Sequence, residues 1–177
     1  NVTIINDSLK IQIIDDDIIN KSPFLFFNDC SFYGLISNKK PNILLIPGAS
    51  FKSKMYPASK YAQLSEKINA NFIVLWGSSS EQKIAQQIKL LSPKVSITSK
   101  LSIDNLKALI SQVNLVVGSD TGPTHMAWGL NIPSIVLFGP TSGNRNSYKT
   151  FFNKYIESDT KVNPFKINKK DFSIRNI

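Results

Sequence analysis

One stretch of the chain brings together several side chains that could do chemistry. It carries a carboxylate, two threonine hydroxyls and the only histidine of the sequence, in the order Asp120, Thr121, Thr124 and His125. Gly122 is followed by a proline, which suits the first position of a helix because its missing N–H would have no partner there. The stretch therefore predicts a helix N-terminus with free N–H groups and hydroxyls, an arrangement that binds anions in α/β proteins.

The same stretch also fits a structural interpretation, in which a buried strand–helix–strand unit has a polar turn only because turns are polar. A single histidine is more often structural than chemical. We favour a binding site because all four side chains fall within one turn of the predicted helix start. From there His125 could donate to phosphate or sugar oxygens.

Length, charge and cysteine content limit the class of protein. A chain of 177 residues can bury the core of one domain, and no apolar run approaches the ~20 residues of a membrane span. The net charge of +9 would suit nucleic acid, phosphorylated small molecules or an anionic membrane. Because the lysines are scattered and no RNA-binding signature is present, we expect no nucleic-acid partner. The one cysteine, Cys30, cannot form an internal disulfide, which fits a reducing cytoplasm.

The first 41 residues lack the pattern of the rest. We expect two short strands, Val2–Ile5 and Lys10–Ile14, and a solvated turn at Asp15–Asp17. The three aspartates could suggest a metal site, but no further ligands follow at a recognisable spacing. Because the chain starts at Asn1 without a methionine or a visible leader, we expect a piece of a longer protein. Residues 1–41 are then an interdomain crossover or the remnant of a preceding domain.

Strands and helices alternate from residue 42 onward. Short apolar runs predict five strands, at Ile43–Ile46, Phe72–Trp76, Val95–Ile97, Leu115–Val117 and Ile135–Phe138. The helices between them should begin at Pro57, at a capping-box pair of Ser79 and Gln82, at Ser102 and at Pro123. Their inward stripes include Tyr61, Leu64, Ser65 and Ile68, then Ile84, Ile88 and Leu91, then Leu106, Leu109, Ile110 and Val113.

This alternation defines the fold class. Parallel strands joined by right-handed helical crossovers form a sheet covered on both faces. We therefore predict an α/β fold, a Rossmann-like doubly wound parallel sheet, over residues 42–150. From Ser142 onward we expect no further element, and residues 151–177 are predicted as a C-terminal tail.

Further loops should lie on the same edge of this sheet, because the carboxyl ends of parallel strands meet there. The candidates after the first three strands are Ser50 with Lys52 or Lys54, then Glu81, then Leu101, which could line a base pocket. Glu81 has a structural alternative, since the helix dipole alone favours glutamate in a first helical turn. A Walker A loop and a Gly-x-Gly-x-x-Gly are both missing, which argues against a nicotinamide dehydrogenase. The loops predict a phosphorylated, nucleotide-linked ligand.

Four motifs follow one another along the predicted domain. They are Pro47-Gly-Ala-Ser50 with Lys54 and Tyr56-Pro57, Trp76-Gly77 with Glu81, Asp120-Thr-Gly-Pro-Thr-His125, and Phe138-Gly-Pro-Thr141. In combination they resemble the ADP-heptose lipopolysaccharide heptosyltransferases over about residues 42–150. The resemblance implies the C-terminal, donor-binding domain of a GT-B glycosyltransferase, which pairs two Rossmann-like domains across a cleft. The Gly-Pro-Thr followed by Asn144-Arg-Asn146 is more similar to heptosyltransferase I, which adds the first heptose to Kdo, than to heptosyltransferase II.

The resemblance implies roles for the residues after the first three strands. Ser50 and Lys54 would hold the diphosphate of ADP-heptose. Ser50 would act alone, because Ala49 stands where the family often has a threonine. Glu81 would bind heptose or ribose hydroxyls, and Leu101 would touch adenine.

The resemblance also implies roles around the first stretch. Asp120, Thr121 and Gly122 would meet phosphate and sugar, Thr124 belongs to the same donor-binding set, and His125 would assist near the phosphate or heptose. The transfer would invert the sugar, and the general base would be an aspartate of the N-terminal domain, so we expect this chain to bind the donor without turnover. No Asp-x-Asp motif stands in these loops. We therefore expect no obligatory metal, and leave open that Mg²⁺ stimulates through the diphosphate.

The implied partners are ADP-heptose and, through the missing domain, a Kdo–lipid A acceptor. We expect a cytoplasmic protein whose basic surface docks weakly on the inner face of the inner membrane. Two alternatives remain open: a GT-B glycosyltransferase or epimerase that uses another nucleotide sugar, and a non-catalytic nucleotide- or phosphate-sensing module. Preference for a UDP ligand over an ADP ligand would favour the first, and binding independent of any partner domain would favour the second.

Overall fold

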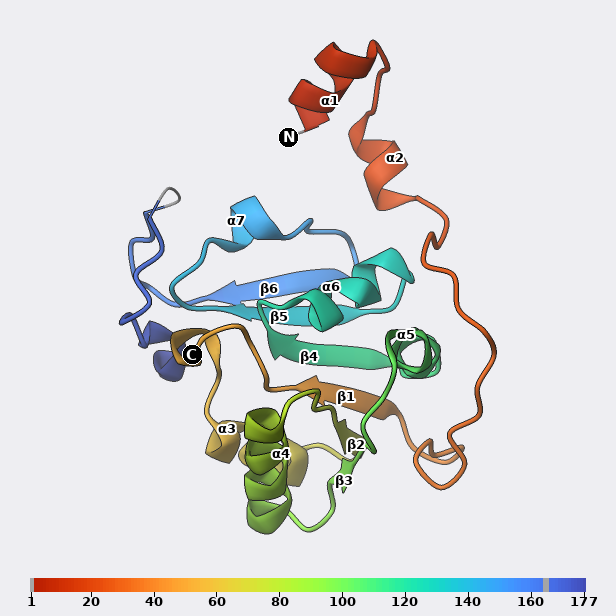
Figure 1. Ribbon diagram of the computed structural model, residues 1–177, viewed down its shortest axis with the longest axis vertical. Coiled ribbons are helices and arrows are strands. Elements are labelled where there is room, and N and C mark those ends of the chain that lie inside the picture. Colours follow the sequence, from red (N-terminus) through yellow and green to blue (C-terminus); the bar gives the residue numbers. More distant parts are fainter. Residues whose placement is uncertain (1, 164–165) are drawn as a thin grey trace.

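A six-stranded parallel sheet forms the centre of the protein (Figure 1). The computed structural model describes residues 2–163 and 166–177. In spatial order the strands are β3 (Ser96–Ile97), β2 (Asn71–Val74), β1 (Asn42–Ile46), β4 (Leu115–Ser119), β5 (Ser134–Phe138) and β6 (Asn153–Glu157). Every neighbouring pair is parallel. The predicted α/β, Rossmann-like class is confirmed.

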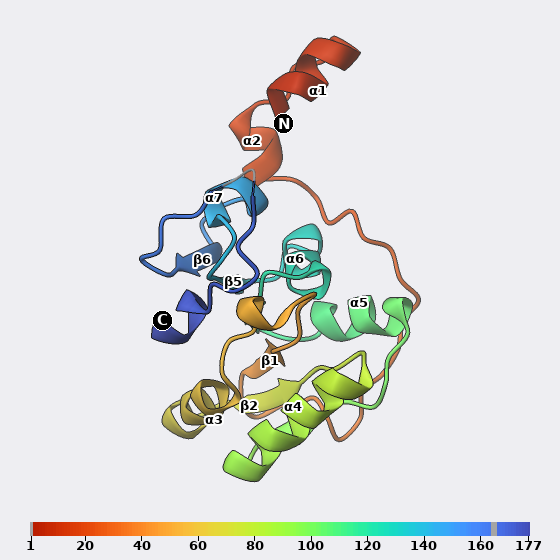
Figure 2. The same cartoon turned by 60° about the vertical axis from the view of Figure 1, so that its left-hand side comes forward.

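Helices cover both faces of this sheet (Figure 2). One face is covered by α3 (Ala58–Lys67) and α4 (Ser79–Leu91), the other by α5 (Ile103–Ser111) and α6 (Gly122–Gly129). The shorter elements are α1 (Val2–Leu9), α2 (Asp15–Ile19), α7 (Gly143–Asn146) and the 3₁₀ turns η1 (Lys52–Lys54) and η2 (Ser173–Asn176). No helix among the described residues is long and apolar enough to cross a membrane.

Strand β1 lies at the point in the sheet where the order of the strands reverses. Its successors β2 and β3 lie on one side, and β4, β5 and β6 lie on the other. Alternate β1 side chains enter two cores, with Leu45 packed in the cluster of α3 and α4 and Leu44 in the cluster of α5 and α6. This reversal makes the gap between β1 and β4 the topological switch point, where α/β proteins place ligands.

The helix starts agree with the sequence prediction to within one residue. Ser102 caps α5 as predicted, its hydroxyl accepting the Asn105 N–H at 3.1 Å. The capping box of α4 is formed by Ser78 and Glu81, one position before the predicted pair. The expected inward position of Leu91 is also wrong, since its side chain is 49% exposed. Ser92, four residues after Ile88, is the buried member of that stripe because helical neighbours recur at i+4.

The N-terminal segment differs from the prediction. Val2–Ile5 belongs to α1, not to a strand. Lys10 adopts a left-handed φ of 52°, which ends the helix and interrupts any extended run over Lys10–Ile14. The aspartates Asp15–Asp17 form the exposed first turn of α2, where the helix dipole favours carboxylates. Neither helix lies beside the sheet (Figures 1 and 2), so these residues have no neighbouring strand with which to pair.

Residues 21–36 cross the protein surface over α5 and α6. The Lys21 ammonium donates to the carbonyl of Trp128 at 2.5 Å and lies 4.6 Å from the centre of its indole ring. The Asn28 N–H donates to Asp104 at 2.9 Å. Leu25 packs against Gly129 so closely that a side chain there would lie within 2.8 Å of it. This part of the predicted crossover is therefore attached to the sheet domain.

The C-terminal region contains elements that the sequence did not predict. Strand β6 pairs with β5 from Ser134↔Asn153 to Phe138↔Glu157. Its first residue, Asn153, is buried through hydrogen bonds to Ser134 and to the Ile132 carbonyl. Ile174 of η2 is fully buried. The expectation of no element after Ser142 is therefore wrong, because this edge strand is fixed by polar contacts and lacks an apolar pattern.

Candidate functional site

The register of the central strands brings two predicted loops together at the switch point. Ile46, the last residue of β1, pairs with Gly118 near the end of β4. The loop after β1 contains η1 with Lys54, and the turn after β4 contains Asp120. Their side chains meet in an ion pair of 2.7 Å between the Lys54 ammonium and Asp120 Oδ2, and each side chain is about a tenth exposed.

Asp120 is the centre of a hydrogen-bonded cluster. The Thr141 hydroxyl donates to its Oδ2 at 2.8 Å, and His125 Nε2 lies 2.9 Å from its Oδ1. Because a carboxylate only accepts, this contact requires a proton on Nε2 of His125. The cluster thus joins the ends of β1, β4 and β5 through one buried carboxylate.

The charge state of Asp120 follows from these contacts. Burial by itself would raise the pKa of Asp120, but hydrogen bonds from His125, Lys54 and Thr141 and the charge of Lys54 outweigh it and lower the pKa to about 2. The carboxylate is therefore charged at neutral pH and holds Lys54 in place as a preset cation.

The N-terminus of α6 opens beside this cluster. Thr121 is the N-cap residue in an extended conformation, and α6 begins at Gly122, one residue before the predicted start at Pro123. Gly122 is exposed, with open space where a side chain would be. A ligand can therefore approach the first turn of α6, where N–H groups and the helix dipole favour negative charge.

Thr124 lies on the other side of the same helix turn. It is fully buried, and its Oγ1 has no hydrogen-bond partner among the described residues. A Cβ on Gly118 would lie only 2.5 Å from this hydroxyl. Thr124 therefore packs helix α6 against β4, and its predicted contact with a donor stays a prediction.

A pocket of about 150 Å³ lies next to the α6 N-terminus. It is lined by three of the predicted residues, Glu81, Leu101 and Thr121, together with Trp76 and Pro123. The Trp76 indole N–H donates to the Thr98 carbonyl at 2.7 Å, which fixes its ring against the loop after β3. Apolar walls with a few polar groups are what a nucleotide base or sugar requires.

Glu81 is placed both to cap helix α4 and to line the pocket. Its Oε2 accepts the N–H groups of Gly77 and Ser78, each at 2.9 Å, as a capping-box glutamate does. Its Oε1 lies so close to Gly48 that any Cβ there would be 2.1 Å away. The carboxylate therefore joins the loops after β1 and β2 while lining the pocket.

The structure does not bring every predicted residue into the cluster. Ser50 is exposed in a bend of the loop after β1, and within the described part of the chain no contact ties it to Asp120. Sequence reasoning placed Thr141 in a motif but not among the site residues. Thr141 could have been predicted as a site residue, because it follows the predicted strand Ile135–Phe138, which ends at the same edge of the sheet. In residues 2–163 and 166–177, no three His, Cys, Asp or Glu side chains gather closely enough to hold a metal ion.

Fold and site together define a parallel α/β domain that presents an anion-binding helix terminus and a small pocket at its switch point. Residues 20–171 match the family model of glycosyltransferase family 9 (heptosyltransferase). The chain belongs to this family.

Relatives and solved structures agree with the family match. The chain is 36% identical to lipopolysaccharide heptosyltransferase 1 of Campylobacter coli over 153 residues, which is 81% of this chain and 44% of that protein. It is 31% identical over 113 residues to lipooligosaccharide heptosyltransferase 2 of Haemophilus influenzae, covering 59% of this chain and 33% of that protein. The chain thus spans less than half the length of these relatives.

The fold likeness extends to more distant structures. The E. coli heptosyltransferase WaaC with ADP superposes with a TM-score of 0.64 at 18% identity, covering 71% of this chain and 40% of that chain. A glycosyl transferase family 9 structure from Veillonella parvula gives a TM-score of 0.65 at 18% identity, covering 78% and 43%. These likenesses show the same fold.

Proposed function

We propose that this chain is the donor-binding half of an inverting heptosyltransferase and that it holds ADP-heptose at the edge between β1 and β4. The observation that carries the proposal is the cluster of Lys54, Asp120, His125 and Thr141 beside the N-terminus of α6. It offers a fixed cation and the N-terminus of a helix to one anionic group. A pocket for the nucleoside lies next to it.

The proposed chemistry follows from where charge develops. When the bond from the anomeric carbon to the diphosphate breaks, the leaving ADP keeps the electron pair and its charge grows. Lys54 and the first turn of α6 would stabilise that charge, and because Asp120 already positions the cation, little rearrangement is needed during the reaction. In this proposal the positive charge of Lys54 would do what a metal ion does in other transferases, and the expectation of no obligatory metal stays a prediction.

The general base is placed outside these residues. Asp120 is unsuited to the role because its pKa is about 2 and three groups occupy its oxygens. An acceptor hydroxyl would lose its proton to a carboxylate of a facing domain. The match to heptosyltransferase 1 of Campylobacter coli over 81% of the chain supports a type I enzyme, with a Kdo–lipid A acceptor.

The binding role of Lys54 can be tested against a neighbour. Lys54→Ala should weaken ADP-heptose binding roughly tenfold or more in calorimetric titration, as expected when a charged hydrogen bond is lost. Lys52→Ala is the matched control, because Lys52 is an exposed lysine of the same 3₁₀ turn. Equal effects of the two substitutions would contradict a specific diphosphate contact by Lys54.

We also propose that the protein works in the cytoplasm and that the loop between β6 and η2 docks it on an anionic membrane. Lys161, Lys166, Lys169 and Lys170 are exposed there, and so is Ile167, at 46%. Lys169 lies 5.8 Å from the ring centre of Phe51, and Lys54 lies 5.3 Å from it, so this loop borders the donor site. Lysines beside an exposed apolar side chain suit an anionic lipid surface.

Vesicle flotation tests the docking. The chain should float with vesicles containing anionic phosphatidylglycerol and not with neutral phosphatidylcholine vesicles. Replacing the four loop lysines by glutamine should abolish flotation, whereas replacing the exposed lysines Lys39, Lys40, Lys83 and Lys100 should not. The same loss in both variants would attribute flotation to net charge alone and overturn the proposal.

A further inference from the structure

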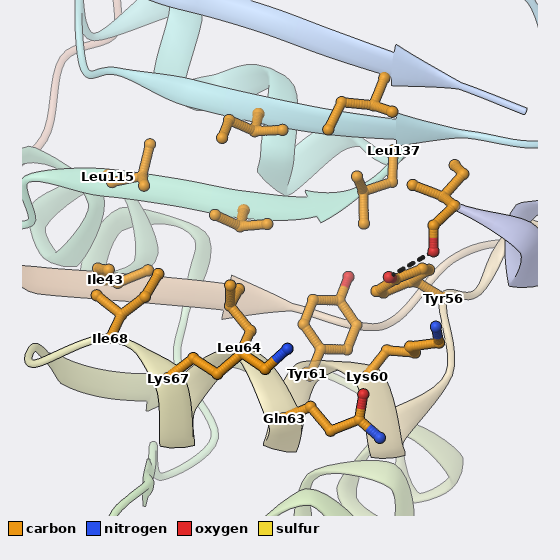
Figure 3. A pocket seen from close by; sticks show the side chains of 14 residues that line it. Ile43, Tyr56, Lys60, Tyr61, Gln63, Leu64, Lys67, Ile68, Leu115 and Leu137 are labelled. Atoms are coloured by element: carbon orange, nitrogen blue, oxygen red, sulfur yellow. Dashed lines mark hydrogen bonds between the residues drawn. The ribbon is translucent and has the colours of Figure 1, made fainter.

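An apolar groove runs along one face of the sheet, on the opposite side of the strands from α6 (Figure 3). Its volume is about 360 Å³. Ile43, Leu115 and Ile135 contribute from three adjacent strands, and Leu64 and Ile68 contribute from the end of α3. Ile68 is 44% exposed and Ile156 of β6 is 45% exposed, so two aliphatic side chains of the groove are open to solvent.

The connections between strands explain why the groove is open. Helix α6, which joins β4 to β5, packs in the core on the other face. Helix α7, which joins β5 to β6, has Gly143 against the ring of Tyr155. Tyr155 and Ile156 are consecutive strand residues and so point to opposite faces. Within the described residues, both crossovers therefore leave the groove side of β4 to β6 without a helix.

An open face of this kind is incomplete for a parallel sheet. Parallel sheets occur almost only with both faces covered, because their strands are apolar on both sides. Here β4 lies between β1 and β5, and β5 lies between β4 and β6, so the backbone groups of both strands are already paired. Over β4 and β5 the groove therefore offers side chains and no unpaired strand backbone, which favours a helix laid into the groove over an added strand.

The dimensions and charges of the groove specify that helix further. Five-residue strands are about 17 Å long, which matches a helix of about 11 residues, or three turns. The charged side chains of the lining are Lys60 and Lys67, both from α3, and no acidic residue lines the groove within the described part of the chain. A carboxylate on the occupant would lie where these ammonium groups can meet it.

We infer that this groove binds an amphipathic α-helix of about three turns, with aliphatic residues against β4 and β5 and acidic residues along the flank that faces Lys60 and Lys67. Filling the groove would also support η2, since Ile177 lines it and its carbonyl accepts the Tyr56 hydroxyl at 3.0 Å. Because η2 lies in contact with η1, the occupied groove buttresses the turn that carries Lys54.

Two synthetic helical peptides of about 12 residues test the charge preference. They share one aliphatic stripe and differ only in carrying glutamates or lysines along its flank. In fluorescence anisotropy titrations the glutamate peptide should bind roughly tenfold more tightly, because it gains two ion pairs with the exposed lysines where the lysine peptide meets two like charges. In the double variant Lys60→Glu, Lys67→Glu the preference should reverse, whereas in Lys83→Glu, Lys100→Glu, with exposed lysines that do not line the groove, it should not.

A second pair of variants tests the location. Ile156→Glu should abolish peptide binding, and Leu90→Glu, at a side chain of α4 that is 82% exposed, should leave it unchanged. Circular dichroism confirms that each variant is folded. Binding that ignores flank charge, or no binding of either peptide to the folded protein, would overturn the inference. So would a concentration-dependent dimer in sedimentation that Ile156→Glu dissociates, because a second copy would then be the occupant.

Discussion

Asp120 is the centre of the candidate site, because it holds together groups from three strand ends. Its contacts with Lys54, His125 and Thr141 leave it 7% exposed. A buried carboxylate with such partners is charged and rigid, and its main effect is to hold a cation and an imidazole at the N-terminus of α6. We therefore regard Asp120 as a positioning residue.

Asp120→Asn should lower the stability of the fold as well as donor binding. The amide keeps the shape but leaves the Lys54 ammonium without its counter-charge in a site that is mostly shielded from water. We expect a loss of about 2 kcal/mol in the free energy of unfolding, measured by urea denaturation. The exposed Asp159→Asn is the control and should change it little. An unchanged midpoint for Asp120→Asn would mean that the ion pair does not contribute to the fold.

The pKa of Asp120 also predicts how stability depends on pH. It falls from 3.8 to about 2 on folding, so the folded state favours the charged form. The resulting stabilisation, about 2 kcal/mol, is complete above about pH 4 and is lost as the pH falls toward 2. Urea denaturation at several pH values should show this loss in the native protein and a much smaller one in Asp120→Asn. Identical acid profiles would contradict it.

The sequence predicted which residues gather at this site better than it predicted the direction of their side chains. The carboxylate, histidine and lysine were identifiable because each follows closely after a strand that ends at the same edge of the sheet. Side-chain direction was not, since it depends on the exact helix register: Thr124 faces the core and Gly122 faces solvent although both belong to the first turn of α6. Glu81 could not be decided either, because a capping glutamate and a ligand-binding glutamate occupy the same position.

The junction of β4 and α6 shows how two elements constrain each other. Gly118 must lack a side chain, since a Cβ would lie 2.5 Å from Thr124 Oγ1 and 2.8 Å from Ile46 Cβ. Gly122, at the start of the helix, has open space instead. The first glycine therefore serves packing, and the second serves the approach of a ligand.

Matched alanine substitutions separate these two functions. Gly118→Ala should destabilise the fold by about 2 kcal/mol through overpacking and weaken nucleotide binding only as a consequence. Gly122→Ala should leave the thermal midpoint unchanged, because alanine suits a helix start, and should weaken ADP binding by obstructing the phosphate. Thermal unfolding followed by titration of each folded variant measures both. Tight ADP binding by Gly122→Ala would place the phosphate elsewhere.

Elements with a hydrophobic period were predictable, and those held by polar contacts were not. Strands β1, β4 and β5 and the stripe of α5 follow directly from apolar spacing. Strand β6 escaped because its buried anchor is an asparagine that hydrogen-bonds to Ser134. The N-terminal helix α1 was mistaken for a strand because a short run of β-branched residues suits either structure when no tertiary partner is known.

At the scale of the whole molecule, the sheet provides two distinct surfaces. Its carboxyl edge carries the proposed donor site, and one face carries the apolar groove. Residues 21–36 and η2 wrap around the domain beyond the limits that the apolar pattern suggests, since Leu25 and Ile174 pack against Gly129 and Gly139. The division into residues 1–41, 42–150 and 151–177 stays a prediction.

The isolated chain should bind the donor without transferring it. Incubation with ADP-heptose and Kdo–lipid A should release no more ADP than the donor alone, because the proposed general base belongs to a facing domain and not to this chain. Release of ADP can be followed with a coupled enzyme assay. Acceptor-dependent release by these 177 residues would show that the base lies within them.

The central claim is that the edge between β1 and β4 holds an adenine nucleotide diphosphate, and calorimetric titration of the chain with ADP and UDP tests it most directly. We predict that ADP binds and that UDP binds roughly tenfold more weakly, since the pocket of Trp76 and Leu101 would be filled by the larger base. The ADP affinity should fall in Lys54→Ala. Equal binding of UDP, or no binding of either nucleotide to the folded chain, would contradict the claim.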